Sequence, residues 1–234
     1  MFSSNLTKFF ALAVLSFLLF SGCRSWQNTG DANSSATPPV SDDLKSEIPF
    51  ATKEPEQFQA EIVVTTGDSE RRTFVARNGT ARRYDFNFGA KNQLTNLQTD
   101  KNYLISAERK IYTESGAGQP VPADDWANFL TTEWLSQKQT AGFEKLETAG
   151  NLTKYRVRLG DGSASEIFIY IDEKTGLPVK QEFYAGGGEQ KVLTYSFELK
   201  NLKLEADAQL FAVPEGFKQV SAEEFQKILR TNKN

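Results

Sequence analysis

The sequence of 234 residues contains no histidine and only one cysteine. Without histidine, the chain cannot form the Ser-His or Cys-His pair that activates the nucleophile in many hydrolases. A zinc site would lack both of its usual ligand types, because a single cysteine supplies only one thiolate. The sequence also lacks the G-x-x-x-x-G-K-[ST] loop that binds nucleotide phosphates. We therefore expect no enzyme, no metal site and no cofactor.

Long hydrophobic runs are also missing. The apolar run from Phe9 to Phe20 has twelve residues. It would form a helix of about 18 Å, which is too short to cross a hydrocarbon core of about 30 Å. A run of this length after a short polar start with Lys8 is typical of a secretory signal segment.

The cysteine follows this run directly, after the small residues Ser21 and Gly22. This arrangement resembles the lipobox of bacterial lipoproteins, although Phe20 stands where that family usually has leucine. The resemblance implies that residues 1–22 are removed as a signal peptide and that Cys23 receives a lipid anchor. Two or more acyl chains anchor a protein stably where one does not. The alternative is an ordinary signal peptide with a cysteine near its end, but that cysteine would have no partner for a disulfide.

The expected mature chain, which starts at Cys23, carries 26 basic and 30 acidic side chains. This negative balance argues against a nucleic acid as a partner and against membrane binding through a polybasic patch. Arg24 follows Cys23, and in the lipoproteins that the sequence resembles this implies an outer-membrane location facing the periplasm. We expect a lipid-anchored monomer of the bacterial cell envelope.

Residues 23–55 are rich in Ser, Thr, Asn, Asp and Pro and show no apolar period. We expect a disordered tether after the lipidated cysteine. Its average reach would be about 30 Å, enough to let the body turn above the membrane. The remaining residues, 56–234, form one expected domain.

Apolar residues alternate with polar ones after residue 56, which predicts β-strands. The first expected strand is FQAEIVVTT at 58–66, and the second is RRTFVAR at 71–77. Asn78-Gly79, which follows the second strand, is a strong hairpin signal. Polar turns separate the other expected strands, at 81–88, 93–99, 102–107, 111–114, 143–147, 152–159, 165–171, 178–184 and 190–204. This spacing predicts a meandering antiparallel sheet.

Two segments are predicted to be helical. Trp126, Phe129, Leu130 and Trp134 recur at three- and four-residue steps, which predicts an amphipathic helix over 124–138. The second helix starts at Ser221, with Glu224 completing a capping box and Val220 placed to contact Phe225. The acidic pairs at both helix starts could in principle supply the two carboxylates of a glycosidase site. They are explained more simply by the helix dipole, which favours acids at a helix N-terminus. The fold class is therefore α+β and mostly β.

Two further stretches carry a resemblance to a family. IYIDEKTGLPVKQEFY at 169–184 reads as two strands around a turn at Gly176, and LFAVPEGFKQV at 210–220 reads as a terminal strand. Together with the lipobox and the meander, they resemble the LolA/LolB/LppX-like superfamily of bacterial envelope proteins. The resemblance implies a strongly curved antiparallel sheet, an incomplete β-barrel, covered by a few helices. It also implies an apolar cavity for lipid or lipoprotein acyl chains in transport, or the sensing role of RseB regulators.

The expected ligand site is a cavity between the first helix and the sheet. Its candidate lining combines the helix stripe with strand aromatics: Trp126, Phe129, Leu130, Trp134, Phe86, Phe168, Tyr170 and Phe183. The strand IFIYI at 167–171 is apolar on both faces, so it needs cover on both sides. The alternative is a filled core in a structural or regulatory module that binds protein partners through a sheet edge or loops.

Overall fold

The computed structural model describes five ranges of the chain, which are residues 44–45, 47–115, 141–160, 165–186 and 191–231. The chain divides into two units, 1–39 and 40–234, and every described residue belongs to the second unit. Cys23 and the helix expected over 124–138 lie outside the described ranges. The candidate lining residues on that helix, Trp126, Phe129, Leu130 and Trp134, therefore remain predictions.

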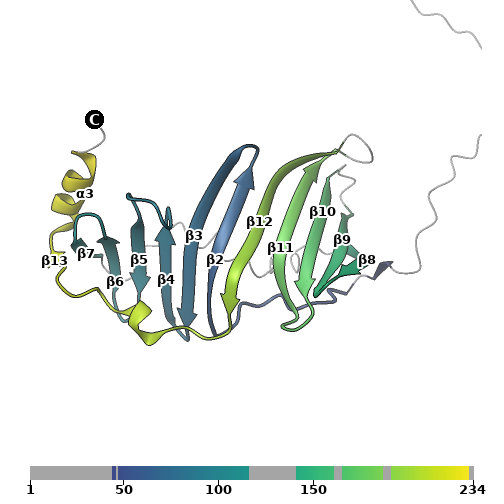
Figure 1. Ribbon diagram of the computed structural model, residues 1–234, viewed down its shortest axis with the longest axis horizontal. Helices are drawn as coiled ribbons and strands as arrows, with labels where there is room; N and C mark the ends of the chain where they lie inside the picture. The colour runs from purple at the N-terminus through teal and green to yellow at the C-terminus, as the bar shows by residue number, and fades with distance from the viewer. Residues whose placement is uncertain (1–43, 46, 116–140, 161–164, 187–190, 232–234) are drawn as a thin grey trace, which may run out of the picture. The chain divides into compact units, whose positions relative to one another are not determined.

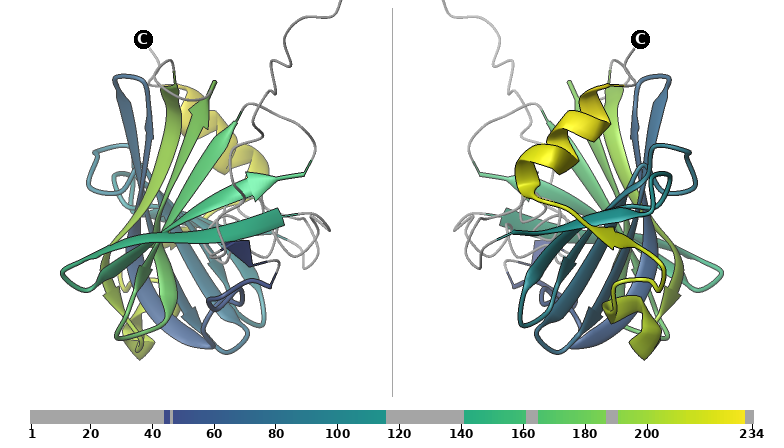
Figure 2. Two further views of the ribbon diagram at one scale, coloured as in Figure 1. Left: turned by 90° about the vertical axis from the view of Figure 1, so that its right-hand side faces the viewer. Right: turned by 90° about the vertical axis from the view of Figure 1, so that its left-hand side faces the viewer.

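A single sheet of thirteen strands dominates the second unit (Figure 1). Its order is β1-β8-β9-β10-β11-β12-β2-β3-β4-β5-β6-β7-β13. The strands are β1 (Leu44–Lys45), β2 (Gln57–Thr66), β3 (Ser69–Asn78), β4 (Ala81–Phe86), β5 (Leu94–Gln98), β6 (Asn102–Ser106), β7 (Ile111–Ser115), β8 (Ala141–Ala149), β9 (Leu152–Leu159), β10 (Glu166–Asp172), β11 (Leu177–Ala185), β12 (Val192–Lys203) and β13 (Lys218–Gln219). The sheet is open and curved (Figure 2). The predicted mostly β fold with a curved antiparallel sheet is confirmed.

Two antiparallel meanders supply eleven of the thirteen strands, one from β2 to β7 and one from β8 to β12, and β1 and β13 add to the two ends. They join where β12 pairs with β2, in a register that places Phe197 opposite Val64 and Leu199 opposite Ile62. This pairing brings together strands that are far apart in the sequence.

The hairpin predicted at Asn78-Gly79 is present between β3 and β4. Asn78 pairs with Ala81, so the two-residue loop consists of Gly79 and Thr80. Gly79 has φ of +61°, a conformation that glycine adopts without the Cβ strain of other residues. The loop is therefore placed one residue later than an Asn-Gly turn, with Asn78 as the last residue of the strand.

The helix α3 (Ala222–Arg230) begins where the capping motif predicted it. The Ser221 hydroxyl accepts a hydrogen bond of 3.1 Å from the backbone N–H of Glu224. Val220 and Phe225 are both buried in one small apolar cluster with Ile111 of β7. The helix therefore packs on the β7 end of the sheet. Within the described ranges, no helix has both the length and the apolar character needed to cross a bilayer.

The terminal strand predicted over 210–220 was largely wrong. This segment contains the 3₁₀ turn η2 (Ala208–Phe211) and only the two-residue strand β13, which pairs in parallel with β7. Asp207 accepts a hydrogen bond of 2.9 Å from Gln209 N–H and so caps the turn. Pro214 has no N–H to donate, and Gly216 has φ of +77°, so neither residue continues a strand.

Parts of the segment that the sequence places in the tether contact the sheet. β1 pairs with β8, and Ile48 and Phe50 pack against the main apolar cluster. The Phe50 ring lies 5.8 Å from the ring of Phe143 and 5.6 Å from that of Tyr155, measured between centroids. Burial of the apolar side chains of Ile48 and Phe50 favours this contact, whereas the polar neighbours would gain nothing from leaving water.

Candidate functional site

The two faces of the sheet differ in chemistry. We call the face that carries Ile62, Val75, Tyr84, Ile169 and Phe197 the core face. The opposite one, which carries Asp85, Ile105, Arg156, Phe168, Tyr170 and Glu182, is the outer face. Strand pairs fix both assignments, because residues directly opposite each other on neighbouring strands share a face and every second residue of a strand lies on the same face.

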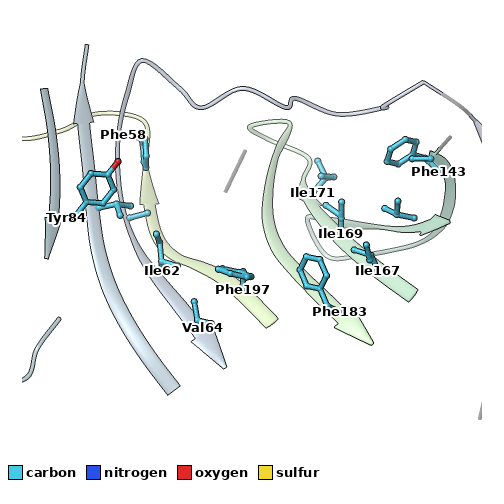
Figure 3. Close-up of a cluster of buried hydrophobic side chains, with 14 residues drawn as sticks. Phe58, Ile62, Val64, Tyr84, Phe143, Ile167, Ile169, Ile171, Phe183 and Phe197 are labelled. Carbon is cyan, nitrogen blue, oxygen red and sulfur yellow. The ribbon is translucent and has the colours of Figure 1, made fainter. Parts of the chain in front are cut away.

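The core face presents one continuous apolar cluster. Figure 3 shows its side chains reaching from β2 and β4 on one side, and from β8, β10 and β11 on the other, into a shared space. Its buried members are Phe58, Ala60, Ile62, Val64, Val75, Tyr84, Ala141, Phe143, Val157, Ile167, Ile169, Ile171, Phe183 and Phe197. No member carries a formal charge and all are buried, so the cluster is an apolar core that extends across eight strands.

A pocket opens beside this cluster, between the segment before β2 and the strands β2, β11 and β12. Its cavity volume is about 20 Å³, roughly the space that one water molecule needs. The lining is mainly apolar, with two charged residues: Phe58, Leu177, Pro178, Leu199, Leu202, Pro55, Lys53 and Glu54.

Glu54 holds one wall of this pocket in place. Its carboxylate lies 2.9 Å from guanidinium nitrogens of both Arg77 and Arg82. Burial by itself lowers the pKa of Arg82, but the charge of Glu54 and the hydrogen bond to Tyr84 outweigh it, so the pKa is raised. Because removing one partner would leave a poorly hydrated charge, this contact ties residues 54–55 to β3 and β4.

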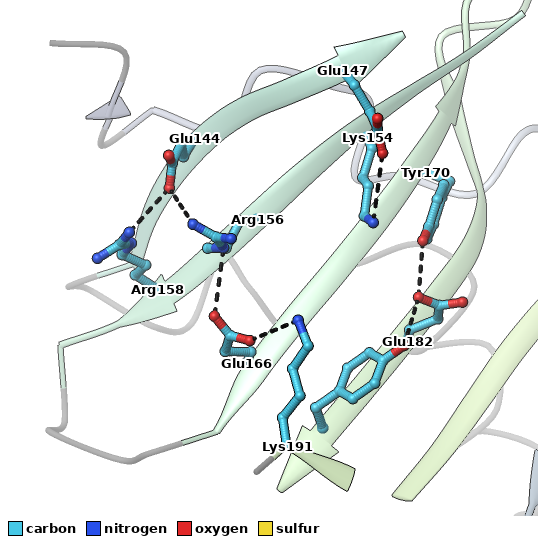
Figure 4. A network of polar contacts seen from close by, with 10 residues as sticks. Glu144, Glu147, Lys154, Arg156, Arg158, Glu166, Tyr170, Glu182 and Lys191 are labelled. Carbon is cyan, nitrogen blue, oxygen red and sulfur yellow. Dashed lines mark hydrogen bonds and ion pairs between the residues drawn. The ribbon is translucent and has the colours of Figure 1, made fainter. Parts of the chain in front are cut away.

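The outer face between β8 and β12 carries ion pairs (Figure 4). Glu144 contacts Arg156 and Arg158 at 3.2 Å each, and Glu166 contacts Arg156 at 3.5 Å and Lys191 at 3.2 Å. The basic and acidic side chains here nearly balance. This face therefore lacks the excess of one sign that would attract a strongly charged ligand.

Phe168 lies beneath these charges and is only 3% exposed. The Nζ atoms of Lys154 and Lys191 lie 4.6 and 4.7 Å from its ring centroid, and the guanidinium carbon of Arg156 lies 5.7 Å from it. Cations attract the ring face, and their aliphatic stems cover apolar surface. The second apolar face of β10, which the sequence analysis expected to need cover, is thus covered by charged side chains.

Glu182 joins β10 and β11 on the same face. Tyr170 and Tyr184 donate hydrogen bonds to its Oε2 atom at 2.8 and 3.3 Å, and Lys180 lies 2.6 Å from Oε1. Burial alone raises the pKa of Glu182, but these hydrogen bonds and the Lys180 charge outweigh burial and lower it. Burial, and then the hydrogen bond to Glu182, raises the pKa of Tyr170.

The four described candidates from the sequence analysis divide between the two faces. Phe183 is a buried member of the core-face cluster, and Phe86 packs against that cluster. Phe168 and Tyr170 lie on the outer face, among the ion pairs. One site on either face therefore cannot contain all four side chains.

Sequence reasoning did not single out several residues of the core face as site candidates. Phe58, Phe143, Ile169 and Phe197 are buried there, and Phe50 packs on them. Their period of two was visible in the sequence, but it does not show which face lies inside the curve. The described residues contain no group of three or more Cys, Asp or Glu side chains placed to hold a metal ion. The chemistry that this face offers is apolar contact.

No model of a protein family matches the sequence, and no curated protein matches it. Several solved structures are similar at low identity. A crystal structure of MucB is 14% identical with a TM-score of 0.45, over 72% of this chain and 60% of that one. The MucA/MucB complex of Pseudomonas aeruginosa gives 18% identity and a TM-score of 0.44, over 67% and 55%.

A LolA superfamily protein from Nitrosomonas europaea is 11% identical with a TM-score of 0.30, over 69% of this chain and 92% of that one. The chain spans less than two thirds of the length of the MucB chains. Because these TM-scores are below 0.5, we assign the fold from strand order and register alone and not from the similar structures.

Proposed function

We propose that this protein is a lipid-anchored lipoprotein of the bacterial cell envelope that binds an acyl chain non-covalently on its core face. The observation that carries the proposal is the continuous uncharged cluster of that face, beside an apolar pocket. Each CH₂ group moved from water to such a surface contributes about 0.8 kcal/mol. A ligand with a long acyl chain would therefore gain more than a small polar one. The function is binding, for handling or sensing a lipid or an acylated protein, without catalysis.

The anchor in this proposal is Cys23, after removal of residues 1–22, in the outer membrane and facing the periplasm. The lipobox-like sequence before Cys23 supports it. The candidate residues Trp126, Phe129, Leu130 and Trp134 belong to the proposal as further contacts of the acyl chain. Anchoring favours receiving, holding or sensing a ligand over carrying it across the periplasm.

Mass spectrometry of the full chain tests binding and anchoring separately. The chain is expressed in a bacterium, extracted in non-ionic detergent and weighed under native and denaturing conditions. The denaturing mass should show loss of residues 1–22 and gain of acyl groups. The native mass should exceed it by that of a lipid, which organic solvent extracts. In Cys23→Ser the covalent gain should disappear, while the non-covalent gain should stay.

Equal native and denaturing masses, even after incubation with dipalmitoylphosphatidylglycerol vesicles, would contradict acyl binding. They would favour a second function, the binding of a protein partner at a sheet edge. One observation supports that alternative. β1 pairs only with Phe143 and Glu144, and within the described ranges no strand pairs with the outer edge of β8 at 145–149. Unpaired N–H and C=O groups on such an edge can accept a strand.

A further inference from the structure

Asn96 is a buried polar residue on the core face. It lies in β5, directly opposite Tyr84 of β4 and Leu104 of β6. The residue is 1% exposed, and among the described residues its Nδ2 atom has no hydrogen-bond partner. An amide donor buried in this state costs about 1–3 kcal/mol, so its presence needs a physical account.

Other buried polar groups of the same strands do have partners. Asp85, on the outer face of β4, accepts hydrogen bonds from Thr95 at 2.5 Å and from Arg83 at 3.0 Å. Thr95 immediately precedes Asn96 and points to the opposite face of the sheet. Its hydroxyl has a hydrogen-bond partner, whereas the Nδ2 atom of Asn96 has none among the described residues. The unpaired donor is therefore a feature of the core face at this position, and not of β5 as a whole.

The position of Asn96 relates it to the apolar cluster. Strand pairing places Ala60, Val75, Tyr84 and Asn96 in one row across β2 to β5. The first three residues belong to the core-face cluster, and Asn96 lies three strand spacings from Ala60 in this row, roughly 14 Å away. Beyond it, Leu104 packs against the separate cluster beneath α3. Asn96 is thus a buried hydrogen-bond donor at the border of the apolar cluster.

We propose that Asn96 donates a hydrogen bond to the acyl carbonyl of the bound ligand. This inference rests on the proposed function and names the part of the ligand that the core face recognises. An ester- or amide-linked acyl chain has a carbonyl acceptor at one end of an apolar tail. With this carbonyl at Asn96, the tail would follow the row of Tyr84, Val75 and Ala60 into the cluster. Binding would then give the donor the acceptor that it lacks.

A pair of lipids that differ only in this acceptor tests the inference in the wild-type protein. Dipalmitoylphosphatidylglycerol carries two ester carbonyls, and its dihexadecyl ether analogue carries none. The full chain in detergent is offered equal amounts of both, and native mass spectrometry measures the bound ratio. One hydrogen bond of ordinary strength predicts about a fivefold preference for the ester. Equal binding of both lipids would overturn the inference.

Two variants locate the preference. Asn96→Leu keeps a side chain of similar size and removes the donor, so the ester preference should fall to about one. Thr113→Val is the matched control, because Thr113 is also buried and lies in the same row, opposite Leu104 on β7. It should keep the preference. Asn96→Leu should melt no lower than wild type, because it removes an unpaired buried donor.

The outcomes separate this inference from the proposed function. Strong binding of both lipids with an unchanged preference in Asn96→Leu would overturn the role of Asn96 and leave acyl binding intact. Binding of neither lipid by the wild-type chain would overturn the proposed function, and the inference with it. Because the wild-type comparison needs no substitution, poor folding of Asn96→Leu would not prevent the test.

Discussion

The core face and the outer face bury apolar side chains by different means, although the same strands supply both. Ile169 is fully buried among other apolar side chains, whereas its neighbour Phe168 is buried to nearly the same extent beneath two lysines and an arginine. Burial of an aromatic residue therefore does not by itself identify a ligand surface. What distinguishes the core face is a continuous cluster of buried side chains without formal charge over eight strands, with the Glu54, Arg77 and Arg82 ion pairs at its edge.

The largest expected effect comes from placing a carboxylate on each face of β10. Ile169→Asp should unfold the domain, because a charge without partners there costs several kcal/mol, against a typical stability of about 5–15 kcal/mol. Phe168→Asp should cost about 3 kcal/mol for the lost ring, since the three cations would pair with its charge. Urea unfolding measures both. Equal destabilisation would contradict the distinction between the faces.

The next effect concerns the segment that precedes β2. Phe50→Ala should destabilise the domain by about 2 kcal/mol, because Phe50 loses its contacts with Phe143 and Tyr155. Lys53→Ala is the control, since Lys53 is exposed in the same segment. A Phe50→Ala protein as stable as the control would show that residues 47–55 do not contribute to the core in solution.

On the outer face, single hydroxyl groups should matter less. Tyr170→Phe should cost about 1 kcal/mol, because it removes the hydrogen bond of 2.8 Å to Glu182. Tyr184→Phe should cost less, since its hydroxyl lies 3.3 Å from the same oxygen. Thermal unfolding of the two variants side by side gives the comparison. The reverse order would mean that the contacts of Glu182 differ in solution.

The smallest effect is a pH dependence that involves Glu182. Its pKa is lowered in the folded protein, so its contribution is complete above the ordinary value of 4.5 and is lost as pH falls through the lower folded value. The loss should be about 1 kcal/mol or less. Glu182→Gln should flatten this part of the curve of unfolding free energy against pH. Glu198→Gln should not, because Glu198 forms an exposed ion pair with Lys200. Identical curves for wild type and Glu182→Gln would exclude the contribution.

Local patterns in the sequence predicted the features that depend on neighbours in the chain. Alternation located most strands, the Ser221 motif located α3, and Ile167, Ile169 and Ile171 were assigned to one face. These succeed because a strand or a helix cap is decided within a few residues.

Features that depend on distant parts of the chain were not predictable in this way. The pairing of β12 with β2, and the packing of Phe50 on Phe143, join segments far apart in the sequence. For the site, alternation places Asn96 on one face with Leu94 and Gln98, but it cannot show that the amide lies buried without a partner. Likewise, it could not show that lysines and an arginine would cover Phe168.

The most direct test of the account compares the two faces in the presence of lipid. Ile62 and Ile169 lie on the core face and Ile105 on the outer face, and all three are buried. Methyl NMR spectra of the full chain are recorded with a phospholipid that carries a spin label near the end of one acyl chain. Acyl binding on the core face should strongly broaden the Ile62 and Ile169 methyl signals, while that of Ile105 stays sharp. Sharp signals from all three, or broadening of Ile105 alone, would contradict acyl binding on the core face.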